Sequence, residues 1–401
     1  MSRFLFVFDI GFDRPGPSVH LLNDIMRSAL LHGHNIDVLS KDTGGTESLI
    51  AKEVMSDPHF HHFIVKDDDE KKYGNIKRYL NEIKYASHCA EIYLKQDKYD
   101  AAFLQSNPTA YFYFRDLKKL GCPVIYNVQD IFPYNLRIVG QSFVNKLLFP
   151  IFRRLQHSAY NKAAMVITIS DDMKRQLIDD GVDPEKIRVI YNWSYSDEPI
   201  VLDDIPKERV FDLHCDKAKT NAVYAGNIGK IQNVELIADA ALLTSDDSSI
   251  HYYVIGDGVN KSFVEEKAGC LKNLTILPMQ PSCFAESIYA QADINLIPMV
   301  RGIIATCLPS KTPTILRVNK PMIFCLDQDS LFGQYMADKE NSIVVSPENA
   351  EELVAAIRAF QNNKVNHSKK IDASIFSRSN AEKYIDSMDT LCGSCLKGSE
   401  K

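Results

Sequence analysis

The stretch FLFVFD, residues 4–9, is a short apolar run that turns polar at Asp9. It is too short for a signal-peptide core followed by a cleavage site, and its length is typical of a strand buried on both faces. Residues 18–32 then carry apolar side chains at helical spacing, Gly33 stands where a helix C-cap is expected, and 36–39 form the next apolar run. The order strand, helix, strand predicts a parallel sheet covered by helices on both faces.

The same alternation continues along both halves of the chain. In the first half it predicts helices over 75–96 and 143–164, and strands over 101–104, 124–128 and 165–169. In the second half it predicts strands, with helices between them, over 222–225, 252–255, 274–277, 294–298, 322–326 and 343–345. The pattern therefore predicts an α/β protein with two Rossmann-like, doubly wound parallel-sheet domains that face a cleft.

One segment interrupts this alternation. Residues 196–215 have little periodicity and many acidic and turn-forming residues, so they are interpreted as a linker. The linker separates an N-terminal domain, 1–195, from a C-terminal domain, 216–372. A terminal helix over 373–395 is expected to pack back toward the N-terminal domain. Ligands of open α/β sheets bind at the carboxyl ends of the strands, so candidate site residues are sought there.

The composition excludes several classes of protein. A formal net charge of −6 gives no basic excess for nucleic acid, so any anion site must be local. Nine cysteines scattered through 401 residues fit reduced thiols in a cytoplasmic protein better than a disulfide framework. No apolar run reaches the ~20 residues that span a bilayer. The eleven histidines show no metal-ligand spacing, and the signatures of serine hydrolases, zinc proteases, P-loop nucleotidases and dinucleotide enzymes are missing from the sequence.

The segment VYAGNIGK, residues 223–230, combines the features of an anion site. The predicted strand 222–225 runs into Gly226, Lys230 adds a cation, and a helix is expected to begin near Val234. Glycines let a ligand approach the backbone, and a helix N-terminus offers unpaired N–H groups. Gly226, Asn227 and Lys230 could therefore hold a diphosphate. The alternative is an ordinary strand-to-helix turn with a solvated lysine.

The segment YVIGDG, residues 253–258, is a second turn of this kind. A strand runs into a glycine-flanked acidic turn, in which Gly256 could admit a ligand while Asp257 caps the following segment. A tight turn that binds nothing is the alternative.

The segment LPSK, residues 308–311, precedes a predicted helix. Ser310 is the expected N-cap, which would place Lys311 in the first helical turn. A cation there opposes the helix dipole, and a residue that works against local stability is a hint of function. Lys311 is thus a candidate for neutralising phosphate, with an exposed lysine as the alternative.

The first domain offers candidates at two predicted strand ends. Gln129 and Asp130 follow the strand 124–128, and a carboxylate there could orient a hydroxyl group or accept its proton. A turn-capping aspartate is the alternative. Gly16 and Ser18 precede the first helix, where Ser18 is the expected N-cap and the backbone could also contact a ligand phosphate.

The segment FVNKLLFPIFRR, residues 143–154, interleaves apolar residues with Lys146, Arg153 and Arg154. Such a helix could dock on an anionic membrane surface. A core helix with basic ends is the alternative.

Taken in order, these segments resemble the family 4 glycosyltransferases of the GT-B fold, of the bacterial surface-polysaccharide type. The resemblance runs from about Phe4 to about Leu391, which is nearly the whole chain. The matching segments are GHNIDV (33–38), VQDIFP (128–133), ITIS (167–170), KIRVIYNW (186–193), YAGNIGK (224–230), IGDG (255–258) and PSK (309–311).

This resemblance implies transfer of a sugar from a nucleotide donor, usually UDP-linked, to an acceptor hydroxyl. The anomeric configuration would be retained, and neither a metal nor another cofactor would be needed, because the nucleotide sugar is a substrate. The acceptor would be a saccharide or a polyprenyl-diphosphate-linked sugar. The expected protein is cytoplasmic, with peripheral contact at the inner face of the plasma membrane and no nucleic-acid partner.

The resemblance also suggests a role for each candidate residue. The donor would lie in the second domain, and Gln129 and Asp130 correspond to first-domain active-site residues. The donor-binding residues implied are Gly226, Asn227 and Lys230 at the diphosphate with Lys311 nearby, Gly256 and Asp257 toward the nucleoside, and Met279 toward the base. Ser310, next to Lys311, is a further substrate-binding candidate. Gly16 and Ser18 would contact substrate from the first domain.

The chain departs from the family at one pair of positions. Many members carry two glutamates eight positions apart, where this chain has Thr306 and Thr314. The second glutamate normally binds the ribose hydroxyls. Thr314 could still form a hydrogen bond, but a neutral bond is roughly half as strong as a charge-assisted one.

Two other functions stay open from the sequence. Nucleotide-sugar 2-epimerases share the two-domain fold, although the acid–base cluster they need cannot be assembled here. A catalytically degenerate subunit that binds a nucleotide sugar is the second alternative, and the two threonines motivate it.

Overall fold

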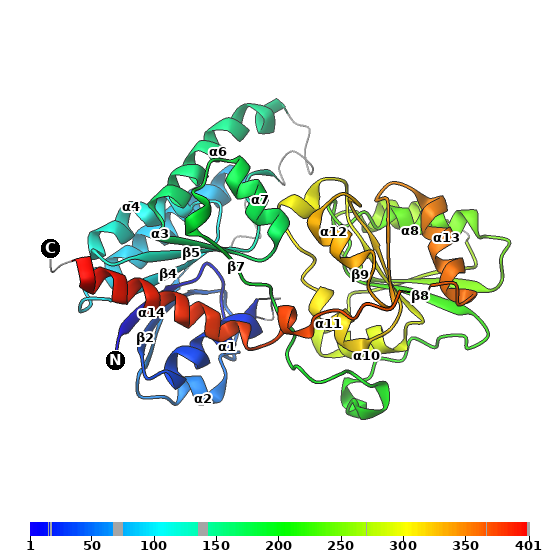
Figure 1. Cartoon of the computed structure of the whole chain (residues 1–401), viewed down its shortest axis with the longest axis horizontal. Coiled ribbons are helices and arrows are strands. Elements are labelled where there is room, and N and C mark those ends of the chain that lie inside the picture. The colour runs from blue at the N-terminus through cyan, green and yellow to red at the C-terminus, as the bar shows by residue number, and fades with distance from the viewer. Residues whose placement is uncertain are drawn as a thin grey trace. The chain divides into compact units, whose positions relative to one another are not determined.

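The computed structural model describes residues 1–14, 16, 18–66, 75–134, 143–269, 271–365 and 367–398. The chain divides into two compact units, each built around one sheet (Figure 1). Unit 1 comprises Met1–Trp193 and Ser377–Lys401, and unit 2 comprises Ser194–Phe376.

Unit 1 alternates strands and helices. Its strands are β1 (Arg3–Val7), β2 (Asn35–Asp42), β3 (Phe60–Lys66), β4 (Ala101–Gln105), β5 (Val124–Val128), β6 (Met165–Thr168) and β7 (Ile187–Val189). Its α-helices are α1 (Val19–Leu31), α2 (Lys52–Met55), α3 (Asn75–Tyr93), α4 (Ala110–Leu117), α6 (Phe143–Lys162), α7 (Asp171–Asp179) and α14 (Asn380–Gly398).

The sheet of unit 1 has the order β3-β2-β1-β4-β5-β6-β7. All of its pairs are parallel, with Phe6 opposite both Val38 and Phe103. The strand order reverses direction between β1 and β4, which creates a topological switch point at the carboxyl edge of the sheet. The prediction of a doubly wound parallel sheet is confirmed for this half of the chain.

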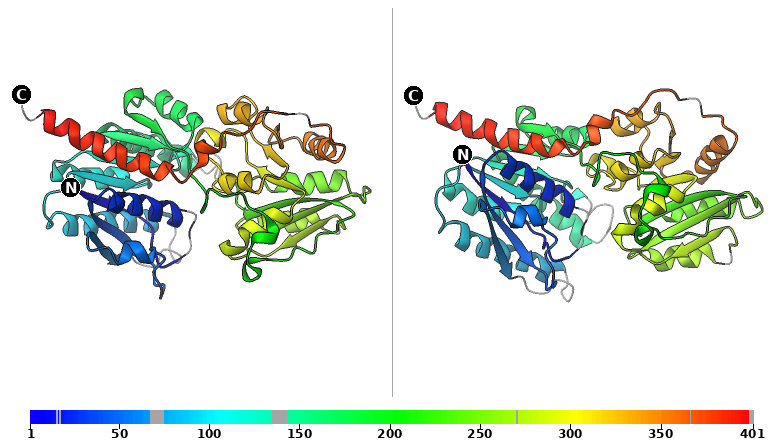
Figure 2. Two further views of the ribbon diagram at one scale, coloured as in Figure 1. Left: turned by 60° about the horizontal axis from the view of Figure 1, so that its bottom comes forward. Right: turned by 90° about the horizontal axis from the view of Figure 1, so that it is seen from below.

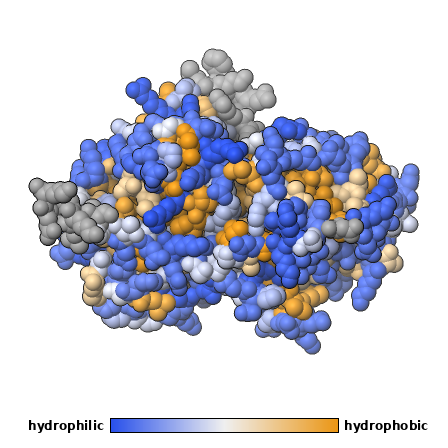
Figure 3. Space-filling view, in the orientation of Figure 1, coloured by the Kyte–Doolittle hydropathy of each residue, from blue (hydrophilic) through white to orange (hydrophobic). Residues whose placement is uncertain are grey.

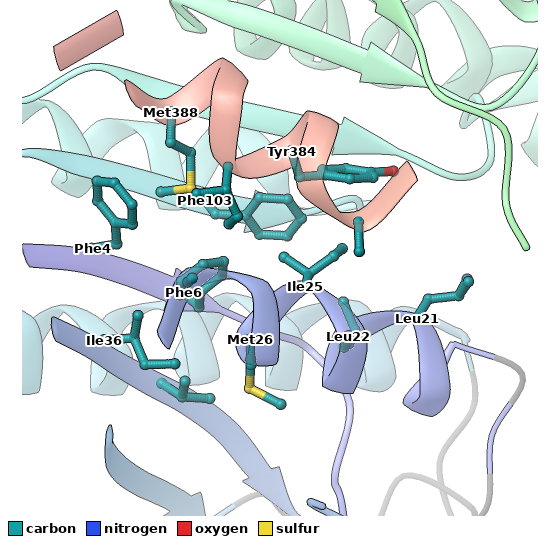
Figure 4. Close-up of a cluster of buried hydrophobic side chains, with 14 of the residues drawn as sticks. Phe4, Phe6, Leu21, Leu22, Ile25, Met26, Ile36, Phe103, Tyr384 and Met388 are labelled. Atoms are coloured by element: carbon teal, nitrogen blue, oxygen red, sulfur yellow. The ribbon is translucent and has the colours of Figure 1, made fainter. Parts of the chain in front are cut away.

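One face of this sheet is covered by α1 and α14, which lie side by side (Figures 1 and 2). Tyr384 and Met388 of α14 point into the same apolar cluster as Phe6, Phe103 and Ile25 (Figure 4). All five side chains are essentially inaccessible to solvent. The last helix of the chain therefore completes the core built by the first strands.

The helix predicted over 373–395 begins later than expected. Residues Ala373–Phe376 form a 3₁₀ turn, and the α-helix starts at Asn380. The backbone N–H of Asn380 bonds to the carbonyl of Ser377 in an intervening turn, so the helical hydrogen-bond ladder cannot extend back through 377–379.

Asp24 of α1 fixes the points where the chain leaves and re-enters unit 1. Its carboxylate accepts the indole N–H of Trp193, the last residue before unit 2, at 2.9 Å. It also accepts two hydrogen bonds from Arg378, the second residue after unit 2, at 3.1 and 2.5 Å. A third donor is Arg27, one turn along α1, at 3.0 Å.

Unit 2 repeats the alternation. Its strands are β8 (Thr220–Asn227), β9 (Ile250–Asp257), β10 (Leu274–Leu277), β11 (Ile294–Pro298), β12 (Met322–Cys325) and β13 (Ser342–Val345). Its α-helices are α8 (Glu235–Leu243), α9 (Lys261–Ala268), α10 (Ala285–Gln291), α11 (Thr312–Val318), α12 (Leu331–Met336) and α13 (Ala350–Gln361).

The sheet of unit 2 has the order β10-β9-β8-β11-β12-β13, and every pair is parallel. The switch point therefore lies between β8 and β11. Helices α8 and α13 pack against each other over one apolar cluster. The predicted second parallel-sheet domain is thus confirmed.

The segment 196–215, predicted as a linker, belongs to unit 2. It is tied to α10 by side-chain hydrogen bonds. The N–H of Phe211 donates to Ser287 Oγ at 3.0 Å, and the N–H of Leu213 donates to Gln291 Oε1 at 3.1 Å. Because side chains of α10 accept hydrogen bonds from its backbone N–H groups, this aperiodic segment packs against unit 2.

The face shown in Figure 3 carries mostly hydrophilic side chains with smaller apolar patches between them. Among the residues that the structure describes, no helix is both long and apolar enough to cross a membrane.

Candidate active site

The turns that follow β8 and β9 pack against each other backbone to backbone. The two strands pair with Gly226 opposite Gly256. A Cβ added to Gly256 would lie 2.0 Å from the carbonyl oxygen of Gly226, and one on Gly258 would lie 2.5 Å from that of Ile228. The N–H of Ile228 also bonds to the carbonyl of Asp257 at 2.8 Å. Gly256 and Gly258 are therefore required by the contact between the two turns.

Lys311 reaches the first of these turns from the start of α11. Its ammonium nitrogen donates a hydrogen bond to the carbonyl of Ala225 at 3.0 Å and lies 3.6 Å from the centroid of the Tyr224 ring. Gly226, at φ 146°, sits directly above it, because a Cβ there would come within 3.1 Å of Lys311 Nζ.

Burial lowers the pKa of the Lys311 ammonium to about 7. Within the described part of the chain, no carboxylate forms an ion pair with this group. A partly buried ammonium without a counter-ion, at the carboxyl edge of a parallel sheet and next to a switch point, is suited to receive an anion.

Two buried tyrosines hold the carbonyl groups of the turn. Tyr224 Oη donates to the carbonyl of Asn227 at 2.5 Å, and Tyr289 Oη donates to the carbonyl of Ala225 at 3.2 Å. Neither tyrosine is predicted as a site residue from the sequence, because a tyrosine inside a strand or a helix is typical of a core position. The sequence feature that could have indicated a role for Tyr224 is its position in the segment 223–230, two residues before Gly226.

Lys230 and Asn227 lie on the surface of the same turn. Both are exposed, and Asn227 Nδ2 makes one long hydrogen bond to Gln232 at 3.4 Å. α8 begins at Glu235, one residue later than expected. Lys230 therefore stands in the turn before the helix rather than at its N-terminus.

The predicted cap of α11 is wrong by one position. Thr312 is the first helical residue and Lys311 is the N-cap, while Ser310 is exposed and lies outside the helix. The N–H of Thr312 bonds to the carbonyl of Pro309 at 3.0 Å, so a turn occupies the positions where the cap was expected. Lys311 consequently leaves the helix axis and turns toward β8.

Asp257 and Met279 lie at the same edge of the sheet. Asp257 is exposed and its carboxylate accepts the N–H of Gly258 at 2.8 Å. The predicted cap on the following helix is wrong, because α9 begins after Asn260 and Asp257 closes only its own turn. Met279 is 47% exposed just beyond β10, the neighbour of β9.

The two threonines at the family's glutamate positions bond within the protein. Thr306 is buried, and its hydroxyl donates to the carbonyl of Ile303 at 3.0 Å. The hydroxyl of Thr314 lies 3.3 Å from that of Ser194, the first residue of unit 2. Thr314 is the more accessible of the two, so it is the one that a ligand could reach.

In unit 1, Gln129 belongs to a chain of amide side chains at the end of β5. Its Nε2 donates to Asn127 Oδ1 at 3.3 Å, and its Oε1 accepts from Asn192 Nδ2 at 2.7 Å. Asn127 in turn accepts from Tyr384 of α14 at 3.2 Å. Gln129 is therefore held in one orientation by its neighbours.

Asp130 follows Gln129 and points to solvent at the carboxyl edge of the unit 1 sheet. Desolvation by the surrounding protein raises the pKa of its carboxyl to about 6. A carboxylate with a raised pKa is better matched to proton transfer near neutral pH than an ordinary aspartate.

Gly16 and Ser18 lie at the same edge, after β1. The carbonyl of Gly16 accepts the N–H of Val19 at 3.2 Å. Ser18 occupies the N-cap position of α1, as predicted, but its hydroxyl makes no capping hydrogen bond. Its carbonyl instead accepts the N–H of Leu22 at 3.0 Å.

The basic segment 143–154 forms the first half of α6. The side chains of 143–147, including Lys146, lie outside the described residues. Phe149 is buried, Arg153 pairs with Asp180 at 2.7 Å, and Ile151 is 53% exposed. The described part of the segment thus has both core and surface positions. No group of three or more His, Cys, Asp or Glu side chains in the described ranges could hold a metal ion.

The fold has known counterparts among solved structures. Sucrose-phosphate synthase from Thermosynechococcus elongatus covers 100% of this chain and 98% of its own, with a TM-score of 0.66 and 10% identity. Anabaena Alr3699/HepE, solved in complex with UDP and glucose, covers 100% of both chains, with a TM-score of 0.61 and 13% identity. Such likenesses define the class: two Rossmann-like domains of the GT-B fold.

Two family models and two curated relatives narrow this class. The model for Glycosyltransferase Family 4 matches residues 20–193, and the model for Glycosyl transferases group 1 matches residues 219–363. The probable glycosyltransferase WbjE of Pseudomonas aeruginosa is 26% identical over 52% of each chain. The putative colanic acid biosynthesis glycosyl transferase WcaI of Escherichia coli (strain K12) is 28% identical over 51% of each.

The two models together match most of the chain, which belongs to the family 4 glycosyltransferases. The matched part spans about half the length of the two curated relatives.

Proposed function

We propose that this chain moves a sugar from a nucleotide-diphosphate donor, UDP-linked, to a saccharide or polyprenyl-diphosphate-linked acceptor in surface-polysaccharide synthesis. The transfer retains the anomeric configuration and needs no metal. The observation that carries the proposal is the Lys311 ammonium, which lies without a described carboxylate partner against Ala225 and Gly226 at the carboxyl edge of the unit 2 sheet.

The chemistry follows from where charge develops. When the bond between the anomeric carbon and the diphosphate oxygen breaks, the electron pair leaves with the phosphate. A cation already in place stabilises that charge at little reorganisation cost. Lys311 supplies a held cation, and Lys230 supplies a second one on the surface of the same turn. The new bond forms from the acceptor oxygen, whose proton Asp130 or the leaving phosphate can accept.

The names of similar proteins support the same reading. The relatives from Pseudomonas aeruginosa and Escherichia coli are described as a probable glycosyltransferase and a putative colanic acid biosynthesis glycosyl transferase. The Anabaena structure was solved in complex with UDP and glucose. These descriptions favour a UDP-linked hexose as the donor of this chain and a polysaccharide precursor as its acceptor.

Substitution of the two lysines tests the donor site. We expect Lys311→Ala and Lys230→Ala each to lower transfer at least about tenfold, since one charge-assisted contact to phosphate contributes about 1.5–3 kcal/mol. Initial rates with UDP-sugars and a pool of lipid-linked acceptors measure the effect. Lys272→Ala is the matched control, because Lys272 is exposed and lies two residues before β10, at the amino end of that strand. Near-wild-type rates for both site variants would remove the proposed role.

A degenerate, sugar-nucleotide-binding subunit is a second candidate. It is favoured by Thr306 and Thr314, whose hydroxyls bond to Ile303 and Ser194. Affinity for UDP-sugars without transfer to any acceptor would select it. An epimerase differs from both, because it would convert a UDP-sugar when no acceptor is present.

Contact with the membrane is proposed for the first half of α6, whose exposed Ile151 lies between basic positions. Co-sedimentation with vesicles containing anionic lipid tests it, with neutral vesicles as the control. Ile151→Glu should reduce the bound fraction, and equal binding to both kinds of vesicle would contradict an electrostatic contact.

A further inference from the structure

The seat of Lys311 is built from an aromatic ring and a carbonyl oxygen. The Tyr224 ring face lies 3.6 Å from Nζ, and the Ala225 carbonyl accepts its hydrogen bond at 3.0 Å. Each part of the seat is itself held. The Tyr224 hydroxyl bonds to the carbonyl of Asn227, and the Tyr289 hydroxyl bonds to that of Ala225. The ring can therefore not turn away from the ammonium without breaking a hydrogen bond.

The seat compensates for an otherwise unfavourable location. Among the described residues, the seat includes two titratable groups: the phenol of Tyr224 on β8, which contacts Lys311, and that of Tyr289 on α10, which bonds to the Ala225 carbonyl. Burial raises the pKa of both well above the ordinary value, so both are neutral at physiological pH. No described carboxylate pairs with the lysine. The negative face of the ring and the carbonyl dipole are then what favours the charged form there.

We infer that Tyr224 is a positioning residue, which holds the Lys311 ammonium against the turn 226–229 and keeps it charged for the diphosphate of the donor. This inference rests on the proposed function and adds to it. It also accounts for Gly226, because a side chain at that position would come between the ammonium and any ligand above the turn.

Progressive fluorination of the ring tests the inference without changing its shape. Phenylalanine and its mono-, di- and trifluorinated analogues are placed at position 224, since each fluorine weakens the negative ring face. The probes are UDP and inorganic pyrophosphate, and affinities are measured by titration calorimetry from pH 6 to pH 9. Tyr224→Phe is the reference of the series, because it keeps the ring face and lacks only the hydroxyl bond to Asn227. Each added fluorine should weaken binding, up to about tenfold, and move the pH at which affinity is lost to lower values.

Two controls separate this role from a structural one. Lys311→Met should abolish the dependence on fluorine content, and Tyr289→Phe should leave it intact. Equal affinities and equal pH profiles across the fluorinated series would overturn the role of Tyr224 alone. A wild-type chain that binds neither UDP nor pyrophosphate would overturn the donor site, and with it this inference.

A further variant, Tyr224→Leu, removes the aromatic ring altogether. If this variant binds UDP like wild type at pH 8, the result contradicts the role of Tyr224.

Discussion

At the scale of single residues, Lys311 shows how place changes chemistry. A lysine ordinarily stays charged to a pH near 10.5, and burial lowers the pKa of this one to about 7. The sequence suggested Lys311 because a cation in a first helical turn opposes the helix dipole. In the structure it is the N-cap, and what makes it unusual is the seat on Tyr224 and Ala225. The residue could be found from the sequence, but the reason for its importance could not.

This pKa predicts how donor binding depends on pH. The charged form binds phosphate, so the affinity for UDP should fall as pH rises through 7 and Lys311 loses its proton. We expect a loss of about tenfold or slightly more between pH 7 and pH 8.5, because the charged fraction of Lys311 falls roughly tenfold per pH unit once the pH is well above the pKa. Titration calorimetry in buffers of different ionisation enthalpy should also detect proton uptake on binding near pH 7.5. A profile that Lys311→Met leaves unchanged would contradict the assignment.

At the scale of elements, apolar runs in the sequence predicted most strands correctly. Segments rich in aromatic residues were not predicted correctly. The bounds of β5, β10 and β11 agree with the predicted ranges. β5 and β11 are buried at every position, and a strand buried on both faces is typically an apolar run of strand length. β3 was missed, since in its sequence FHHFIVK two histidines and a lysine interrupt the apolar residues, as suits a half-exposed edge strand. α4 was missed because AYFYFRDL is rich in aromatic residues, which favour strands by propensity. Tertiary packing against α3 and α6 decides that it is helical.

Asp24 of α1 binds the chain both where it leaves unit 1 and where it re-enters it, and this predicts an effect on stability. Asp24→Ala removes the carboxylate that accepts hydrogen bonds from Arg378 and from the buried indole of Trp193, so unit 1 should lose about 2–3 kcal/mol of unfolding free energy. Asp97→Ala is the control, because Asp97 is 98% exposed and its ion pair with Arg3 should contribute less than about 1 kcal/mol. Urea denaturation followed by circular dichroism measures both. Equal denaturation midpoints for the two variants would show that Asp24 does not anchor the points where the chain leaves and re-enters unit 1.

At the scale of the whole molecule, unit 1 is discontinuous in sequence. It starts with β1 and is completed by α14, which follows all of unit 2. The terminal helix places Tyr384, Ile385 and Met388 in the core and bonds Asn127 beside Gln129. Stability of the first half of the chain therefore depends on residues at its far end.

Truncation after Phe376 tests this dependence. Removing three buried apolar side chains from the core should cost about 5 kcal/mol or more, at about 1.5–3 kcal/mol each. Unit 1 should then be digested rapidly by protease, while a fragment with ends near 194 and 376 persists. Glu382→Ala, at an exposed position of α14, is the control and should leave the digestion pattern unchanged. Survival of an intact 1–193 fragment in the truncated chain would contradict the predicted dependence.

The sequence by itself determined the two parallel sheets, most of the strands, and the turns that contain the site glycines and lysines, within 223–230, 253–258 and 308–311. Burial on both faces imposes apolar runs of strand length, and turns at the carboxyl edge need glycine. Tertiary structure alone decided that Lys311 meets the carbonyl of Ala225, 86 positions earlier, and that Tyr384 of α14 donates a hydrogen bond to Asn127 of the first sheet. Such contacts depend on strand order, which places β8 beside β11, and the local periodicity of a chain carries no information about which strands become neighbours.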